Sequence, residues 1–67
     1  MTNTLGEEVK ERRRRLGLDQ QDLANLAGVS TSFVYFVEHH KKTVRLDKLE
    51  NVLEALGLEL VVKLRST

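Results

Sequence analysis

Residues 16–30 have the sequence LGLDQQDLANLAGVS and carry the signals that decide the fold. Gly17 is placed to end a first helix, and Asp19 is a suitable N-cap for a second. Gly28 closes that second helix, and Ser30 is the N-cap of a third that starts almost at once. The pattern predicts three short helices joined by tight turns, over residues 4–16, 20–27 and 30–39.

The apolar residues around this stretch recur at the spacing of amphipathic helices. For the helix over residues 20–27 they predict a buried face made of Leu23, Ala24, Leu26 and Ala27. For the third helix the inward-facing residues are Phe33, Val34 and Val37. Beyond a polar connector the same spacing continues over residues 46–56, and it predicts a fourth helix that Gly57 ends.

Length and composition exclude several classes of protein. The 67 residues suffice for one domain, and without cysteine neither a disulfide nor a Cys-ligated zinc ion can stabilise its small core. No apolar run approaches the roughly 20 residues that cross a bilayer, and no signal peptide is evident, so we expect a cytoplasmic protein. No catalytic triad, phosphate loop or metal-binding set is present, and the adjacent His39 and His40 point apart on a helix, which argues against an enzyme, a metal site and a cofactor.

The formal net charge is only +1, but the basic residues are unevenly distributed. Residues 10–15 have the sequence KERRRR, and residues 39–45 form a second basic cluster with the sequence HHKKTVR. Such clusters have two interpretations, a solvent-exposed helix face or contacts with nucleic-acid phosphates, and both stay open at this point.

The last ten residues change to the period of a β-strand. Apolar Leu58, Leu60, Val62 and Leu64 alternate with the residues between them. One strand cannot satisfy its own backbone groups, and nothing else in the chain has a strand pattern. The segment is therefore either frayed or paired with a second copy of itself. We favour pairing, with residues 1–57 as the helical domain and residues 58–67 as the dimerisation segment.

Two short helices joined by a tight turn can place the second helix in the major groove of DNA. Polar residues at the start of that helix then reach the base edges. In this chain these residues are Ser30, Thr31 and Ser32, followed one turn later by Tyr35. The alternative is that Ser30 is only a cap and that Thr31 and Ser32 are neutral surface.

The sequence of residues 16–30, with Val34, Glu38 and the pair Leu56-Gly57, resembles the Xre/Cro-type helix-turn-helix family. The resemblance covers residues 5–57. It implies a mainly α fold, a Cro/repressor-like bundle of four to five helices. It also implies a function: a homodimer that binds double-stranded operator DNA in a sequence-specific way and represses transcription.

The resemblance further implies roles for individual residues. Thr31, Ser32 and Tyr35 occupy positions that contact base edges, and Arg13 and Glu38 match an ion pair between the first and third helices. Gln20 matches a glutamine that binds a phosphate and supports the third helix. Together, the expected phosphate contacts are Gln20, Ser30, Lys41, Lys42 and Thr43.

The C-terminal third resembles one branch of this family more closely. Residues 44–49, VRLDKL, and residues 56–60, LGLEL, followed by a strand, are similar to the HipB-like branch. This resemblance implies that the strands of two subunits pair across the dimer through Leu58, Leu60, Val62 and Leu64. It also implies a HipA-like kinase toxin as partner, with the protein acting as antitoxin and repressing its own operon.

The sequence departs from the family pattern at four positions. His40 and Lys42 stand where the family often has glycine and proline, and Tyr35 and Phe36 stand where it has polar residues. Phe33, the third aromatic residue of this window, has the spacing of a core residue. Tyr35 and Phe36, with the low net charge, support an alternative function: a protein-interaction module on the same fold that binds little or no DNA.

Overall fold

The computed structural model describes residues 4–39 and 43–62. These residues form four helices, and their bounds agree with the predicted ranges to within one residue at each end. In chain order they are α1 (Leu5–Arg15), α2 (Gln20–Ala27), α3 (Thr31–Glu38) and α4 (Leu46–Ala55). A fifth helix, allowed by the prediction, is absent from these two ranges.

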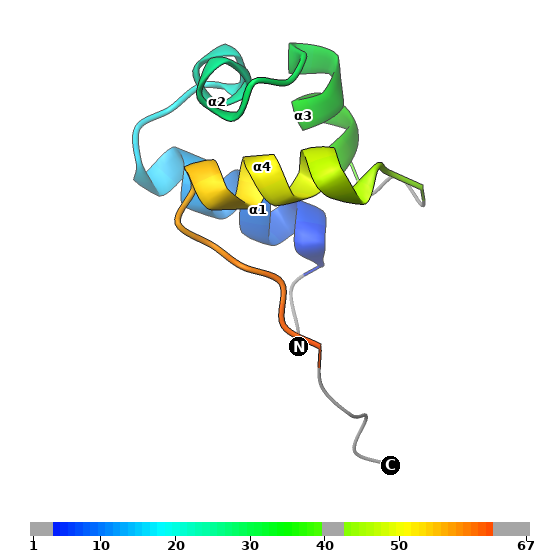
Figure 1. Cartoon of the computed structure of the whole chain (residues 1–67). Coiled ribbons are helices and arrows are strands. Elements are labelled where there is room, and N and C mark those ends of the chain that lie inside the picture. Colours follow the sequence, from blue (N-terminus) through cyan, green and yellow to red (C-terminus); the bar gives the residue numbers. More distant parts are fainter. Residues whose placement is uncertain (1–3, 40–42, 63–67) are drawn as a thin grey trace.

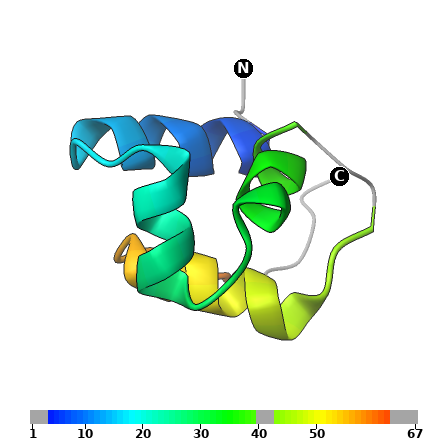
Figure 2. The same ribbon diagram turned by 90° about the horizontal axis from the view of Figure 1, so that it is seen from above.

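The helices are arranged in two layers. α2 and α3 lie above α1 and α4 in Figure 1, and the view from above shows α1 and α4 on opposite sides of the bundle (Figure 2). α2 packs against α3 and α4, while α3 packs against α1. The α2–turn–α3 unit is thereby supported by both helices of the other layer.

Local signals fix the α2–α3 unit as the sequence predicts. The Asp19 carboxylate accepts a hydrogen bond from the backbone N–H of Asp22 at 2.7 Å, and the Ser30 hydroxyl accepts one from that of Phe33 at 3.0 Å. Between the helices, Gly28 has a φ of +70° and nothing within 4 Å of the place where a Cβ would lie. The turn therefore needs glycine for its left-handed backbone conformation and not for space.

The buried core takes apolar residues from all four helices and from Leu56, which directly follows α4. Its members are Val9, Leu23, Ala24, Ala27, Val34, Val37, Leu49, Val52, Leu53 and Leu56. Two residues predicted to face inward are missing from this set: Leu26 is 63% exposed, and Phe33 is only half-buried. At about 100° of rotation per residue, Leu23, Ala24 and Ala27 share one face of α2, and Leu26 falls outside it.

The three aromatic residues divide between the core and the surface. Phe33 is half-buried and packs against the core, and the ammonium group of Lys48 lies 6.0 Å from the centre of its ring. Tyr35 and Phe36 are 46% and 44% exposed. Phe33, which was expected to be a core residue, thus packs at the edge of the core.

The segment after α4 leaves the helical bundle (Figure 1). Leu58 packs against the core and its backbone N–H donates to the carbonyl of Leu53 at 2.8 Å, but Leu60, Val61 and Val62 are exposed. No strand forms within residues 43–62, and Leu64 lies outside the described residues. In the described part of the chain, every helix is too short or too polar to span a membrane.

Candidate nucleic-acid interface

The residues predicted to contact bases lie on the side of α3 that faces away from the core. Val34 and Val37 are buried against the other helices, whereas Ser32 and Tyr35 are exposed and Thr31 is half-buried. Because α3 begins at the Ser30 cap, Thr31 and Ser32 form its first turn. The structure therefore brings Thr31, Ser32 and Tyr35 together on one outward face.

A charged pair in the core holds α3 in place. Arg13 on α1 donates from Nε to Glu38 Oε2 at 2.7 Å and from Nη2 to Glu38 Oε1 at 2.9 Å, so the contact is bidentate. Arg13 Nη1 donates to the carbonyl of Leu18 at 2.9 Å. The two side chains matched by the resemblance thus form an ion pair between α1 and the end of α3.

Gln20, the first residue of α2, completes this cluster. Its Nε2 donates to Glu38 Oε1 at 3.2 Å, so the side chain supports α3 through Glu38. A primary amide has two N–H donors, so the bond to Glu38 is compatible with the phosphate contact predicted for Gln20. Ser30 has a similar double capacity, because its oxygen caps α3 while its hydroxyl proton can still be donated.

The cluster keeps Glu38 ionised. Burial alone favours the neutral acid, but hydrogen bonds from Arg13 and Gln20 and the positive charge of Arg13 outweigh it, and they hold the pKa of Glu38 below its ordinary value. The hydrogen bond to Glu38 raises the pKa of Arg13 in turn, against an opposing effect of burial. Both groups are therefore charged at neutral pH.

A second hydrogen-bonded chain, which sequence reasoning missed, fixes the start of α3. The Thr31 hydroxyl donates to Gln21 Oε1 at 2.7 Å, and Gln21 Nε2 donates to Asn25 Oδ1 at 3.0 Å. Gln21 and Asn25 are one turn apart on α2, and this spacing was the only signal in the sequence. Since Thr31 is ten residues from Gln21, the contact depends on how α2 and α3 cross.

Aromatic rings stack at the other end of α3. The rings of Tyr35 and His39 are 3.7 Å apart and nearly parallel, and His39 Nδ1 lies 2.8 Å from the backbone carbonyl oxygen of Tyr35. Phe36 meets Tyr35 edge to face at 6.2 Å. His39 thus limits the positions open to the Tyr35 ring, a role that the sequence did not indicate.

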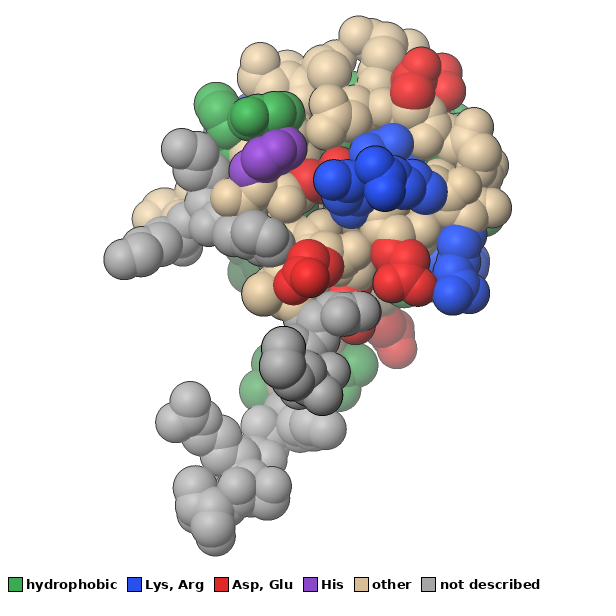
Figure 3. Space-filling view, turned by 180° about the vertical axis from the view of Figure 1, so that it is seen from behind, with side chains coloured by type: hydrophobic (Ala, Val, Ile, Leu, Met, Phe, Trp, Pro, Cys, Tyr) green, Lys and Arg blue, Asp and Glu red, His purple; other side chains and the backbone are tan. Residues whose placement is uncertain are grey.

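The arginine run of residues 12–15 is mostly engaged within the molecule. Besides the buried Arg13, Arg12 Nε donates to the carbonyl of Leu56 at the end of α4 at 2.9 Å, and Arg15 pairs with Glu11 at 3.0 Å. On the face shown in Figure 3, Lys and Arg side chains lie among Asp and Glu side chains and form no uniform patch. Intramolecular contacts therefore account for three of these four arginines.

The connector between α3 and α4 is described from Thr43 onward. Thr43 is exposed, and a hollow beside it is lined by Phe33, Phe36, Val44, Arg45 and Lys48. Two of the predicted phosphate contacts, Lys41 and Lys42, lie outside the described residues, as does His40. Phosphate contact by these residues stays a prediction.

A family model described as a helix-turn-helix domain matches residues 4–65 of this chain. Because the match covers nearly the whole sequence, the chain belongs to the helix-turn-helix domain family. Within this family it is of the Xre/Cro type. The comparison with curated proteins gives no match.

Solved structures of regulators share the fold. SinR, named as the master regulator for biofilm formation and solved in complex with DNA, is 26% identical, with 84% of this chain and 90% of SinR covered and a TM-score of 0.75. The restriction-modification controller protein C.AhdI from Aeromonas hydrophila is 34% identical, with 82% and 83% covered and a TM-score of 0.74. A SinR protein/SinI protein complex matches with 27% identity, 82% and 54% coverage and a TM-score of 0.74.

Proposed function

We propose that the protein is a DNA-binding transcriptional regulator that acts as a homodimeric repressor. In this proposal α3 of each subunit enters the major groove of operator DNA, and the two half-sites lie about 34 Å apart. Thr31, Ser32 and Tyr35 discriminate between base pairs. Gln20, Ser30, Lys41, Lys42 and Thr43 contact phosphates and supply affinity that is independent of sequence.

The observation that carries this proposal is the outward face of α3. Its first turn presents two hydroxyl side chains and its second turn presents a tyrosine, and all three lie away from the buried Val34 and Val37. The helix is held from behind by the ion pair of Arg13 and Glu38. Such an exposed polar helix face suits the major groove, which admits one α-helix. The solved DNA complex of SinR, with the same fold, supports this function.

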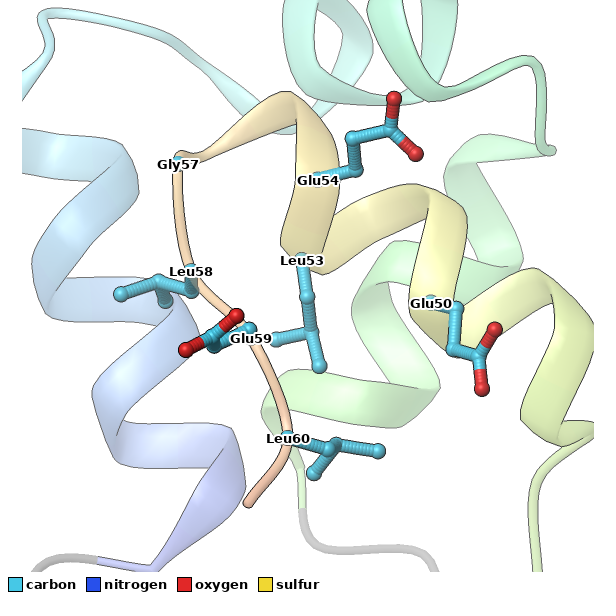
Figure 4. A pocket seen from close by; sticks show the side chains of 7 residues that line it. All are labelled: Glu50, Leu53, Glu54, Gly57, Leu58, Glu59 and Leu60. Carbon is cyan, nitrogen blue, oxygen red and sulfur yellow. The ribbon is translucent and has the colours of Figure 1, made fainter.

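The homodimer rests on the segment after α4. A hollow of about 430 Å³ lies between α4 and residues 57–60, and Figure 4 shows Leu53 and Leu60 beside it, together with the carboxylates of Glu50, Glu54 and Glu59. Leu60 and Val62, two of the four residues predicted to pair, are exposed in the single chain. A strand from a second subunit would cover these apolar groups and supply backbone partners, as the alternation of residues 58–64 predicts.

Selection from random double-stranded DNA tests the proposal. The full chain should enrich one sequence with two symmetric half-sites, and replacing Thr31, Ser32 and Tyr35 together with alanine should abolish the preference for it. The matched control is Lys41→Ala, which should weaken binding to all sequences alike and reduce the salt dependence. A triple variant that binds the selected operator as tightly as the wild type would overturn the assignment.

The HipB-like role is a further part of the proposal. The resemblance of residues 44–60 supports it, and it names a HipA-like kinase toxin as partner. The test is co-purification of the protein at native abundance, together with the identity of the neighbouring gene. A kinase-like protein in the complex, encoded beside this one, is the expected result. If no kinase-like protein is found in the complex and none is encoded by the neighbouring gene, the antitoxin role is contradicted and the repressor role stays in place.

The alternative function, a protein-interaction module, is favoured by one observation. Tyr35 and Phe36 are each nearly half exposed on the helix that would meet DNA. The same selection experiment, carried out at low salt, separates the two functions, because an interaction module would enrich no DNA sequence.

A further inference from the structure

The hydroxyl of Thr31 has a fixed direction in this structure. Thr31 Oγ1 donates to Gln21 Oε1 at 2.7 Å, which is a short and favourable hydrogen bond. The Gln21 amide is oriented in turn, because its Nε2 donates to Asn25 Oδ1 at 3.0 Å. Three side chains of α2 and α3 therefore form one directed chain of hydrogen bonds that ends on the predicted DNA-facing surface.

This direction decides what Thr31 can offer to a base. A hydroxyl has one proton and two lone pairs, and Gln21 already takes the proton. As long as this hydrogen bond is made, Thr31 Oγ1 can only accept a hydrogen bond from DNA. In the major groove the donors are the amino groups at adenine N6 and cytosine N4, whereas guanine O6 and N7, adenine N7 and thymine O4 are acceptors.

We propose that Gln21 positions the hydroxyl of Thr31 and thereby determines specificity. With its proton held by Gln21, Thr31 selects adenine or cytosine at the base that it contacts. The inference rests on the proposed DNA-binding function and adds a chemical preference to it. A threonine or serine hydroxyl that is free to rotate suits either donors or acceptors and discriminates weakly. Gln21 removes that freedom before DNA binds, so the preference requires no reorganisation at the moment of contact.

Ser32 provides a contrast within the same turn of α3. It is exposed, and among the described residues its hydroxyl has no side-chain partner comparable to Gln21. Its proton can therefore point toward a base acceptor or away from it. We expect the base opposite Ser32 to vary more among selected sequences than the base opposite Thr31.

Three variants of the full chain test this inference by selection from random DNA and by competition between operators that differ at one base pair. In the wild type, adenine or cytosine opposite Thr31 should be preferred over guanine or thymine by about tenfold. Gln21→Leu removes the acceptor and frees the hydroxyl, so the preference should fall to about twofold or less. Thr31→Val keeps the shape of the side chain and should lose the preference as well, which identifies Thr31 as the contacting residue.

Gln21→Glu is the matched control. A carboxylate can only accept, so it holds the Thr31 proton as the amide oxygen does. Its negative charge should weaken binding to every sequence, while the tenfold base preference stays. A merely structural role of Gln21 predicts a different result: both Gln21 variants would change affinity, and Gln21→Leu would keep its base preference as Gln21→Glu does. Circular dichroism of each variant tests whether the substitution leaves the helices intact.

The outcomes separate this inference from the proposed function. If the wild type enriches no sequence, both are overturned. If it enriches an operator with guanine or thymine opposite Thr31, or if Gln21→Leu keeps the full preference, only the role of Gln21 is overturned. Retention of the preference in Gln21→Glu and its loss in Gln21→Leu together support it.

Discussion

Arg13 and Glu38 are joined by two hydrogen bonds of 2.7 and 2.9 Å, and the Glu38 side chain is fully buried. The pair links the last turn of α1 to the last residue of α3, and Gln20 adds a hydrogen bond from the start of α2. Three helices thus meet at one carboxylate. The position of α3, and with it the placement of Thr31, Ser32 and Tyr35, depends on this charged contact.

Replacing Glu38 with alanine should destabilise the protein severely. The substitution leaves the Arg13 guanidinium buried without its counter-ion, which typically costs about 3–5 kcal/mol. A domain of this size has a total stability of the same order, so the variant should be largely unfolded at room temperature. Chemical denaturation followed by circular dichroism measures the loss.

The exposed pair of Glu11 and Arg15 gives the matched control. Its two side chains are largely solvent-accessible and one helical turn apart, so Glu11→Ala should change the free energy of unfolding by no more than about 0.5 kcal/mol. Equal effects of the two substitutions would contradict the importance assigned to the buried pair.

The stability of the fold should decrease in acid because of the same carboxylate. The pKa of Glu38 in the folded state lies below its ordinary value of 4.5, so the folded state binds this proton less readily than the unfolded chain does. Its contribution is therefore fully present above the unfolded pKa and is lost as the pH falls through the folded pKa. Unfolding curves at a series of pH values should show constant stability from this group near neutrality and a decline below about pH 4.5. A Glu38→Gln variant whose acid dependence equals that of the wild type would contradict this origin.

Local chemistry explains which parts of the fold the sequence could predict. Helix bounds were predicted to within one residue because Asp19 and Ser30 act on backbone groups only three residues away. The prediction that Leu26 is buried was wrong. The eight residues of α2 contain too few turns to locate the buried face from apolar spacing alone.

Contacts between distant residues could not be predicted in this way. The hydrogen bond of Thr31 to Gln21 and that of Arg12 to the carbonyl of Leu56 join residues 10 and 44 positions apart, and both depend on helix packing. The C-terminal strand is a different case. Its backbone needs a second chain, so residues 58–62 of one chain do not test the prediction.

Replacing Gly28 with alanine should isolate the conformational cost of the turn between α2 and α3. The space beside Gly28 is open, so a methyl group meets no neighbour, but its φ of +70° is unfavourable for any residue with a Cβ. We expect a loss of about 1 kcal/mol in the free energy of unfolding. Gly28→Asn should lose less, because asparagine tolerates the left-handed conformation better than alanine. Equal stability of the alanine variant and the wild type would show that the turn can adopt another conformation.

Replacing Leu60 with lysine should weaken the proposed dimer. Full burial of a leucine side chain contributes about 1.5–3 kcal/mol. Leu60 is 48% exposed in the single chain, so each copy can gain about half of this and the two copies of a dimer about the whole, and the dimer dissociation constant should rise about tenfold or more. Sedimentation equilibrium over a range of concentrations measures it. Leu26→Lys is the control, because it removes an even more exposed leucine from α2 and should leave self-association unchanged. Residues 58–67 are not the dimerisation segment if Leu60→Lys dimerises as tightly as the wild type, or if the wild type is monomeric at all concentrations. The two α3 helices must then be brought to DNA in some other way.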